Sequence, residues 1–166
     1  MRNLIALPLL GLAVILQSVL VSRVMLLSGY ADLVLVLLSA WALQPQVDSA
    51  WHWALLAVVL VAFSSRLPWP VVAGGYFVVV LLAQLLKRRV WQAPLLAMFS
   101  VTFLGTLVMH LLSYIGLSLL GTPLVLGDVL GLVTLPSLLL NLLFSIPVYT
   151  FMRDLSRWVY PGEEVE

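Results

Sequence analysis

The sequence predicts an all-α membrane protein that crosses the bilayer several times. Of its 166 residues, 63% are hydrophobic and only 9% are charged, and the mean hydropathy is +1.16. Soluble domains carry about 25% charged residues. The apolar residues also gather into stretches that approach the ~20 residues a helix needs to span the bilayer. The chain length leaves room for about six such helices and for no separate soluble domain.

Each apolar stretch is flanked by charged or turn-forming residues. The first lies between Arg2 and Arg23 and lacks a small-residue cleavage site, so we interpret it as an uncleaved helix and not as a signal peptide. The second is interrupted by SGYAD, where Asp32 is expected to cap the helix that continues. LPWP is a non-helical link before the fourth. The predicted spans are 3–22, 24–44, 51–65, 71–86, 94–120 and 130–152, followed by a short acidic tail, 161–166.

The positions of the basic residues predict the topology. If the N-terminus is cytoplasmic, two of the eight Lys and Arg residues, Arg23 and Arg66, fall outside, and six fall inside: Arg2, Lys87, Arg88, Arg89, Arg153 and Arg157. Both termini are therefore expected in the cytoplasm. We interpret the KRR motif at 87–89 as fixing this topology; the alternatives are contact with anionic lipid or with an acidic cytoplasmic partner. All six tryptophans lie near predicted span ends, where indole rings favour the headgroup region: Trp41, Trp51, Trp53, Trp69, Trp91 and Trp158.

The sequence offers little for catalysis. The absence of Cys excludes disulfides, thiolate metal sites and cysteine nucleophiles. There is no H-E-x-x-H motif, and no pair of carboxylates lies deep in two spans. The basic residues are scattered and the net charge is +1, which does not indicate a nucleic-acid partner. We therefore expect a protein without enzymatic activity, metal or cofactor.

Two ionisable residues have competing interpretations. His110 shares one face of the fifth helix with Thr102, Thr106 and Tyr114, because these residues recur every fourth position. It is either a proton or ligand site or, as we favour, a neutral imidazole that bonds to a neighbouring helix. Asp32 is either an intramembrane carboxylate paired with Arg23 or, as we favour, a helix cap.

The last apolar stretch carries a polar stripe. Ser137, Asn141, Ser145 and Tyr149 repeat every fourth residue, and lipid would not tolerate such a face in the bilayer. We expect Asn141 to bond to another helix of the same chain, with Gln17 as the leading candidate, in a bond worth about 0.6 to 2 kcal/mol. Pro136 fits the first turn of this helix, and Pro147 should kink it.

Two segments resemble the family of the rod shape-determining protein MreD, a small polytopic protein of bacterial cell-wall elongation. The first is LQSVLVSRVMLLSGYADLVLVLL (16–38), with Leu16-Gln17, Gly29 and Asp32-Leu33 as its matching positions. The second is LPSLLLNLLFSIPVYTFMRDLSRWVYP (135–161), and its matching positions are Leu135-Pro136-Ser137, Asn141, Tyr149, Arg153 and Arg157. Ala31 stands where the family usually has proline, and VAFSSR (61–66) stands where it often has Gly-Leu-x-x-Asp.

The resemblance implies a non-enzymatic scaffold subunit of the elongation machinery, multi-pass in the bacterial plasma membrane. Its partners would be MreC, the glycosyltransferase RodA, a class B penicillin-binding protein and the filament protein MreB. The family is thought to share its helical fold with the substrate-binding subunits of energy-coupling-factor vitamin transporters. The alternative function is therefore that of a small-solute-binding subunit of such a transporter. Candidate contact residues are Gln17, Asp32, His110, Asn141 and Tyr149, and Lys87, Arg88, Arg89, Arg153 and Arg157 would set topology or contact lipid.

Overall fold

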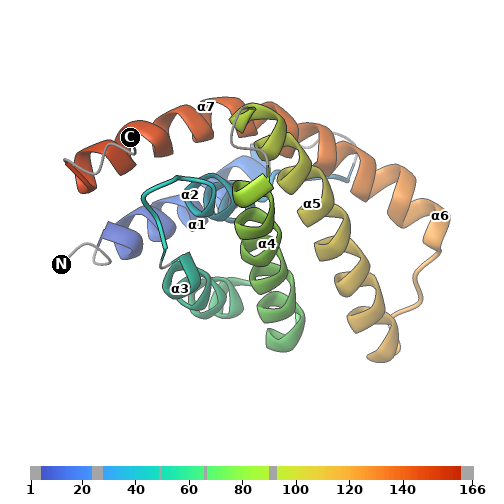
Figure 1. Cartoon of the computed structure of the whole chain (residues 1–166). Coiled ribbons are helices and arrows are strands. Elements are labelled where there is room, and N and C mark those ends of the chain that lie inside the picture. Colours follow the sequence, from blue (N-terminus) through green and yellow to red (C-terminus); the bar gives the residue numbers. More distant parts are fainter. Residues whose placement is uncertain (1–4, 24–27, 49, 66, 90–92, 162–166) are drawn as a thin grey trace.

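The chain folds as a set of helices beneath one long C-terminal helix (Figure 1). The structure is a computed structural model that describes residues 5–23, 28–48, 50–65, 67–89 and 93–161. The elements, in chain order, are α1 (Ala6–Arg23), α2 (Leu33–Ala42), α3 (Ala50–Ser64), α4 (Trp69–Arg89), α5 (Pro94–Leu119), α6 (Leu126–Asp128), the π-helix η2 (Val129–Thr134) and α7 (Leu135–Val159). No strand is formed within these described ranges, so the all-α prediction is confirmed for them.

Three helical stretches are long and apolar enough to cross a membrane: 69–88, 94–119 and 126–159. They indicate a membrane protein. The other main helices are shorter, so six full spans are not established. The clearest difference from prediction is the second span, expected over 24–44: among its described residues, 28–44, only Leu33–Ala42 are helical, as α2. At 1.5 Å per residue, ten residues cover about 15 Å of a hydrocarbon core about 30 Å thick.

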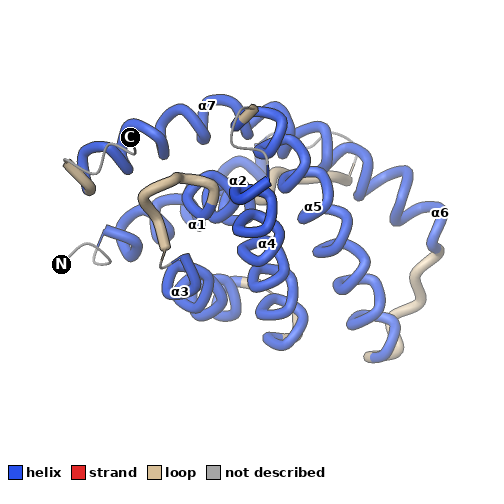
Figure 2. The backbone as a smooth tube through the Cα atoms, viewed as in Figure 1, coloured by secondary structure: helices blue, strands red, loops and turns tan. Residues whose placement is uncertain are grey.

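Helix α2 lies at the centre of the molecule, and all of its residues are buried. It packs against α1, α3, α4, α5 and α7, and the other helices surround it in Figure 1. A helix that is hydrophobic all round belongs in a core, because it has no face suited to water. The tube in Figure 2 shows that most of the described chain is helical.

Helices α4 and α5 approach each other closely because glycine faces their interface. A Cβ on Gly75 would lie 2.5 Å from the Met109 side chain, and one on Gly105 would lie 2.8 Å from Val79. Small residues allow membrane helices to pack closely, which increases van der Waals contact where lipid supplies no hydrophobic driving force. Gly75 of the Gly74-Gly75 pair thus serves close packing.

Two tryptophans contradict the prediction that all six lie in the headgroup region. Trp41 and Trp53 are fully buried, and their rings stack with centroids 4.3 Å apart. Their positions near polar turns suggested an interface, but both side chains turn into the core between α2 and α3, where two large aromatic surfaces gain more from burial and stacking. Trp51, Trp69 and Trp158 are exposed, and Trp91 lies outside the described residues.

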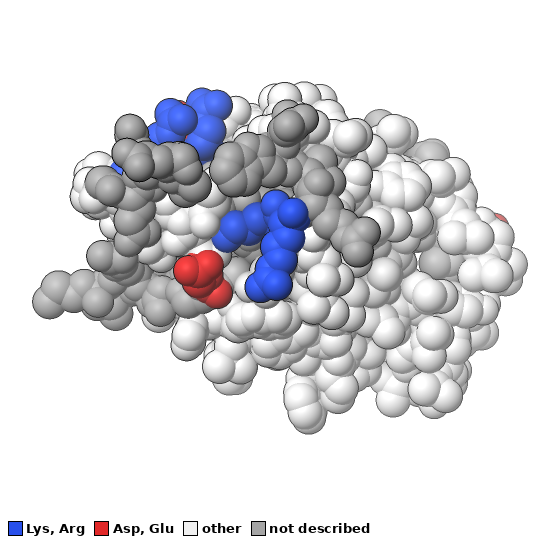
Figure 3. Space-filling model, viewed as in Figure 1, with Lys and Arg blue, Asp and Glu red and all other residues white. Residues whose placement is uncertain are grey.

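On the face shown in Figure 3, most of the Lys, Arg, Asp and Glu side chains that are visible lie in one half of the view. Lys87 at the end of α4 donates a hydrogen bond from Nζ to the Val47 carbonyl (2.9 Å). Arg153 near the end of α7 pairs with Asp154 at 3.2 Å, with both side chains well exposed. The rest of the face in Figure 3 is largely free of Lys, Arg, Asp and Glu, as expected for a surface covered by lipid.

Candidate functional site

The non-helical segment 28–32 is hydrogen-bonded to the long C-terminal helical stretch. The three bonds run from the Ser28 N–H to the Leu132 carbonyl (3.1 Å), from the Tyr30 N–H to Ser137 Oγ (2.9 Å), and from the Asp32 N–H to Asn141 Oδ1 (2.7 Å). We call these six residues the junction. In the bilayer, non-helical backbone is tolerated only where the protein itself satisfies its polar groups. The polar stripe on α7 performs this role.

The π-helix ahead of α7 supplies one of the acceptors. Pro136 lies in the first turn of α7, as predicted, and η2 extends the helical structure ahead of it to Leu126. In η2 the backbone N–H groups bond to the carbonyl five residues earlier, as that of Leu135 does to Leu130. The Leu132 carbonyl of this π-helix accepts the N–H of Ser28 and so forms part of the junction.

Gly29 allows the two segments to come this close. A Cβ at this position would lie 2.6 Å from the Pro136 Cβ, 2.7 Å from the Ser137 nitrogen and 2.9 Å from the Val133 oxygen. Two of these three atoms belong to the backbone of a helix, which cannot move aside as a flexible side chain could. Glycine is therefore required at Gly29 by the close approach of one backbone to another.

Asn141 joins three parts of the chain. Its Oδ1 accepts the Asp32 N–H, and its Nδ2 donates to Thr106 Oγ1 on α5 (2.9 Å). It is 1% exposed, so both bonds form away from solvent. The expectation of a partner within the chain is correct, but Gln17 as that partner is wrong. Gln17 Oε1 instead accepts the Val34 N–H at 3.5 Å, because the start of α2 also needs acceptors for its free N–H groups.

Asp32 is the N-cap of α2, as predicted. Its Oδ1 accepts the Leu35 N–H at 2.9 Å and the Tyr76 hydroxyl at 3.4 Å. No sequence pattern pointed to Tyr76 as a partner, although it is the one residue with a polar side chain in VVAGGYFVVV (71–80). The side chain of Arg23, the other partner considered for Asp32, lies outside the described side chains.

His110 bonds to the π-helix that precedes α7. Its Nδ1 lies 3.0 Å from Thr134 Oγ1 in η2, and its ring centroid is 6.3 Å from that of Tyr30. Thr106 and Thr102, one and two turns earlier, are buried. The His110 face thus points into the protein and toward η2 and α7, as the interpretation of His110 as a hydrogen-bonded core residue requires.

The remaining candidate residues lie away from the junction. Tyr149 is buried on α7, on the same stripe as Ser145, whose hydroxyl donates to the carbonyl of Leu142 in its own helix (2.6 Å). Further along α7, Ser156 Oγ donates to Gln44 Oε1 at 3.4 Å. Sequence reasoning missed this last contact, and the fourth-residue spacing of the stripe does not extend to Ser156.

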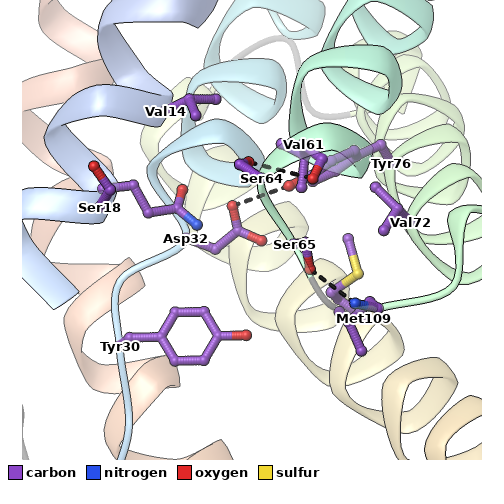
Figure 4. Close-up of a pocket in the computed structure, with 12 residues that line it drawn as sticks. Val14, Ser18, Tyr30, Asp32, Val61, Ser64, Ser65, Val72, Tyr76 and Met109 are labelled. Atoms are coloured by element: carbon purple, nitrogen blue, oxygen red, sulfur yellow. Dashed lines mark hydrogen bonds between the residues drawn. The ribbon is translucent and has the colours of Figure 1, made fainter.

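A cavity of about 400 Å³ lies beside the junction (Figure 4). It is lined by residues of α1, the 28–32 segment, α3, the link to α4, α4 itself and α5. Its polar lining includes Gln17, Ser18, Tyr30, Asp32, Ser64 and Tyr76. Its size falls in the range of small-molecule sites, which measure roughly 300 to 1,000 Å³. No group of three His, Asp or Glu residues among the described positions has the arrangement of a metal site.

The fold and the junction define a class: an all-α protein with three helices able to cross a membrane and a buried polar centre where a non-helical segment meets α7. Comparison with models of known families, with curated proteins and with solved structures finds no match to this chain.

Proposed function

We propose that this protein is a non-enzymatic scaffold of the bacterial cell-wall elongation complex, of the MreD type, in the plasma membrane. One observation carries the proposal. The positions that resemble the MreD family lie about a hundred residues apart, yet Gly29 and Asp32 from the first segment contact Pro136, Ser137 and Asn141 from the second. A chance likeness between two apolar sequences would not be expected to select the residues that meet at one buried junction.

The buried polar groups support a structural role over a catalytic one. Asn141 uses both its oxygen and its nitrogen within the junction, and the hydroxyl of Ser137 accepts a backbone N–H. Thr106 accepts from Asn141 and donates to the Thr102 carbonyl (2.7 Å). These hydrogen bonds hold the helices in register. Because the polar side chains are already bonded within the protein, they are poorly placed to exchange protons with a substrate.

The apolar surface supports partner binding within the membrane. Large hydrophobic side chains are exposed on several helices, including Phe63 at 89% and Leu119 at 82%. Lipid covers such a surface by default, and a partner's transmembrane helix can replace it. We infer that the protein binds MreC, RodA with its class B penicillin-binding protein, and MreB. It would act by contacting a partner better in one conformation than in another.

Depletion of the protein tests this function. Rod-shaped cells that depend on the protein should become round or wide when they lose it, because elongation would lose a subunit, and the wild-type gene should restore the rod. Cell width in phase-contrast images is the readout. Rods of normal width after the protein has disappeared from the membrane fraction would contradict the proposal.

A second candidate function rests on the cavity beside Asp32. A membrane subunit that binds a small solute for an energy-coupling-factor transporter needs a pocket with a few polar groups, and the 400 Å³ cavity offers one. Loss of such a subunit would reduce uptake of one vitamin and leave cell shape unchanged. Growth of the depleted cells in medium with and without vitamins separates this candidate from the scaffold.

A further inference from the structure

The cavity beside the junction has an acidic and aromatic lining on one side and an apolar lining on the other. It contains one carboxylate, Asp32, which is 92% buried, and two tyrosines, Tyr30 and Tyr76. Figure 4 shows the Asp32 carboxylate and the Tyr30 hydroxyl pointing into the same space, with Val72 and Met109 on the opposite wall. None of the described residues that line it is Lys, Arg or His. The cavity is thus acidic at one end and apolar at the other.

The cap does not explain why this residue is an aspartate. Asn and Ser cap helices about as well as Asp, because the cap requires only a side-chain oxygen that accepts a backbone N–H. A buried carboxylate without a cation costs several kcal/mol, of order the penalty for any unpaired buried ion. Asp32 has no basic partner among the described side chains. A carboxylate accepts about four hydrogen bonds, and the N–H groups of Leu35 and Val34 together with the Tyr76 hydroxyl leave part of that capacity unused.

We propose that this cavity binds a small organic cation, an amine with an apolar body, whose ammonium group pairs with Asp32. Tyr30 and Tyr76 suit the same ligand, because aromatic faces attract cations and phenol oxygens accept N–H bonds. The apolar wall accommodates the hydrocarbon part. The exposed residues Ser18 and Ser64 form the mouth through which it enters. The site is independent of the proposed function, since a scaffold and a solute-binding subunit could each contain it.

Thermal unfolding of the full chain in mild detergent tests the site. The probes are benzylamine, phenethylamine and cyclohexylamine at pH 8, with benzyl alcohol as a neutral molecule of the same shape as the first. At ten times its dissociation constant, an amine that binds should raise the melting temperature by roughly 3 to 6 °C. Benzyl alcohol should give no such shift, which controls for partitioning into the micelle.

Two variants separate binding from folding. Asp32→Asn keeps an oxygen for the Leu35 N–H but removes the charge, so it should weaken amine binding roughly 10- to 100-fold. Ser18→Trp should obstruct the mouth without touching Asp32. Thr150→Val, on the exposed face of α7, is the matched control and should keep the full shift.

The shifts in melting temperature of wild type and the variants show whether the cavity binds an amine through Asp32. Loss of the shift in folded Asp32→Asn or, where that variant does not fold, in Ser18→Trp supports it. A shift retained in either folded variant would overturn it. Equal shifts with benzyl alcohol, or no shift with any of the three amines on wild type, would also overturn it.

Discussion

Replacing Asn141 with leucine should destabilise the protein through the junction. The substitution removes the acceptor of the Asp32 N–H and the donor to Thr106 Oγ1. A buried N–H left without a partner costs about 1 to 3 kcal/mol, and an interhelical bond in a membrane protein contributes about 0.6 to 1 kcal/mol. The sum is about 2 to 4 kcal/mol, which exceeds the value expected from a single interhelical bond.

This loss should lower the melting temperature in detergent by roughly 5 to 15 °C. Thr150→Val is the matched control: it lies on the same helix and removes an exposed hydroxyl that bonds only to Ile146 of its own helix (3.1 Å). It should melt within about 1 °C of wild type, since surface changes are small. Tryptophan fluorescence during heating would measure all of these transitions.

A double substitution tests whether the contact itself is responsible. Thr106→Val removes the acceptor that Asn141 Nδ2 uses, so Asn141→Leu with Thr106→Val should cost less than the sum of the two single losses. Strict additivity would show that the two side chains do not interact. If Asn141→Leu has the same melting temperature as wild type, the polar stripe on α7 does not stabilise the protein and the predicted role of Asn141 is wrong.

Three further predictions follow from the same structure. Gly29→Ala should destabilise more than Gly11→Ala, whose Cβ would meet nothing within 4 Å, and equal melting of the two would show that the close approach is absent. His110→Ala should lower stability or assembly and remove no turnover, so a purified protein that loses a measurable activity while still folded would contradict the scaffold. Single cysteines placed in this cysteine-free chain should be labelled from outside the cell by an impermeant reagent within 121–128 and not at position 89 or 163, and outside labelling at 89 would overturn the predicted topology.

The sequence predicted the general character of the junction but not its connections. Spacing alone placed Ser137 and Asn141 on one face of a helix and showed that this face needs polar partners. The sequence favoured Gln17 as the partner because it identifies polar side chains directly. It does not show which backbone N–H groups lack a hydrogen-bond acceptor. The true partners are the N–H groups of Tyr30 and Asp32, and only the interruption SGYAD signalled that this backbone is not helical.

Tertiary packing also overrode one local signal. Trp41 lies next to a polar turn, which is typical of an interfacial residue, but its ring stacks on Trp53, a residue of another helix, in the core. The position of Pro136 in the first turn of α7 was predicted correctly. The π-helix η2 ahead of it was not predicted, because no simple sequence pattern exists for a π-helix.

The proteins that co-purify with this chain distinguish a scaffold of the elongation complex from a transporter subunit. The full chain would be tagged, purified from native membranes in mild detergent, and analysed by mass spectrometry beside a Thr150→Val control and an Asn141→Leu sample. We expect MreC, RodA and a class B penicillin-binding protein with wild type and with the control, and reduced recovery of these proteins with Asn141→Leu. Recovery of energy-coupling transporter subunits in place of these partners would contradict the proposed scaffold function.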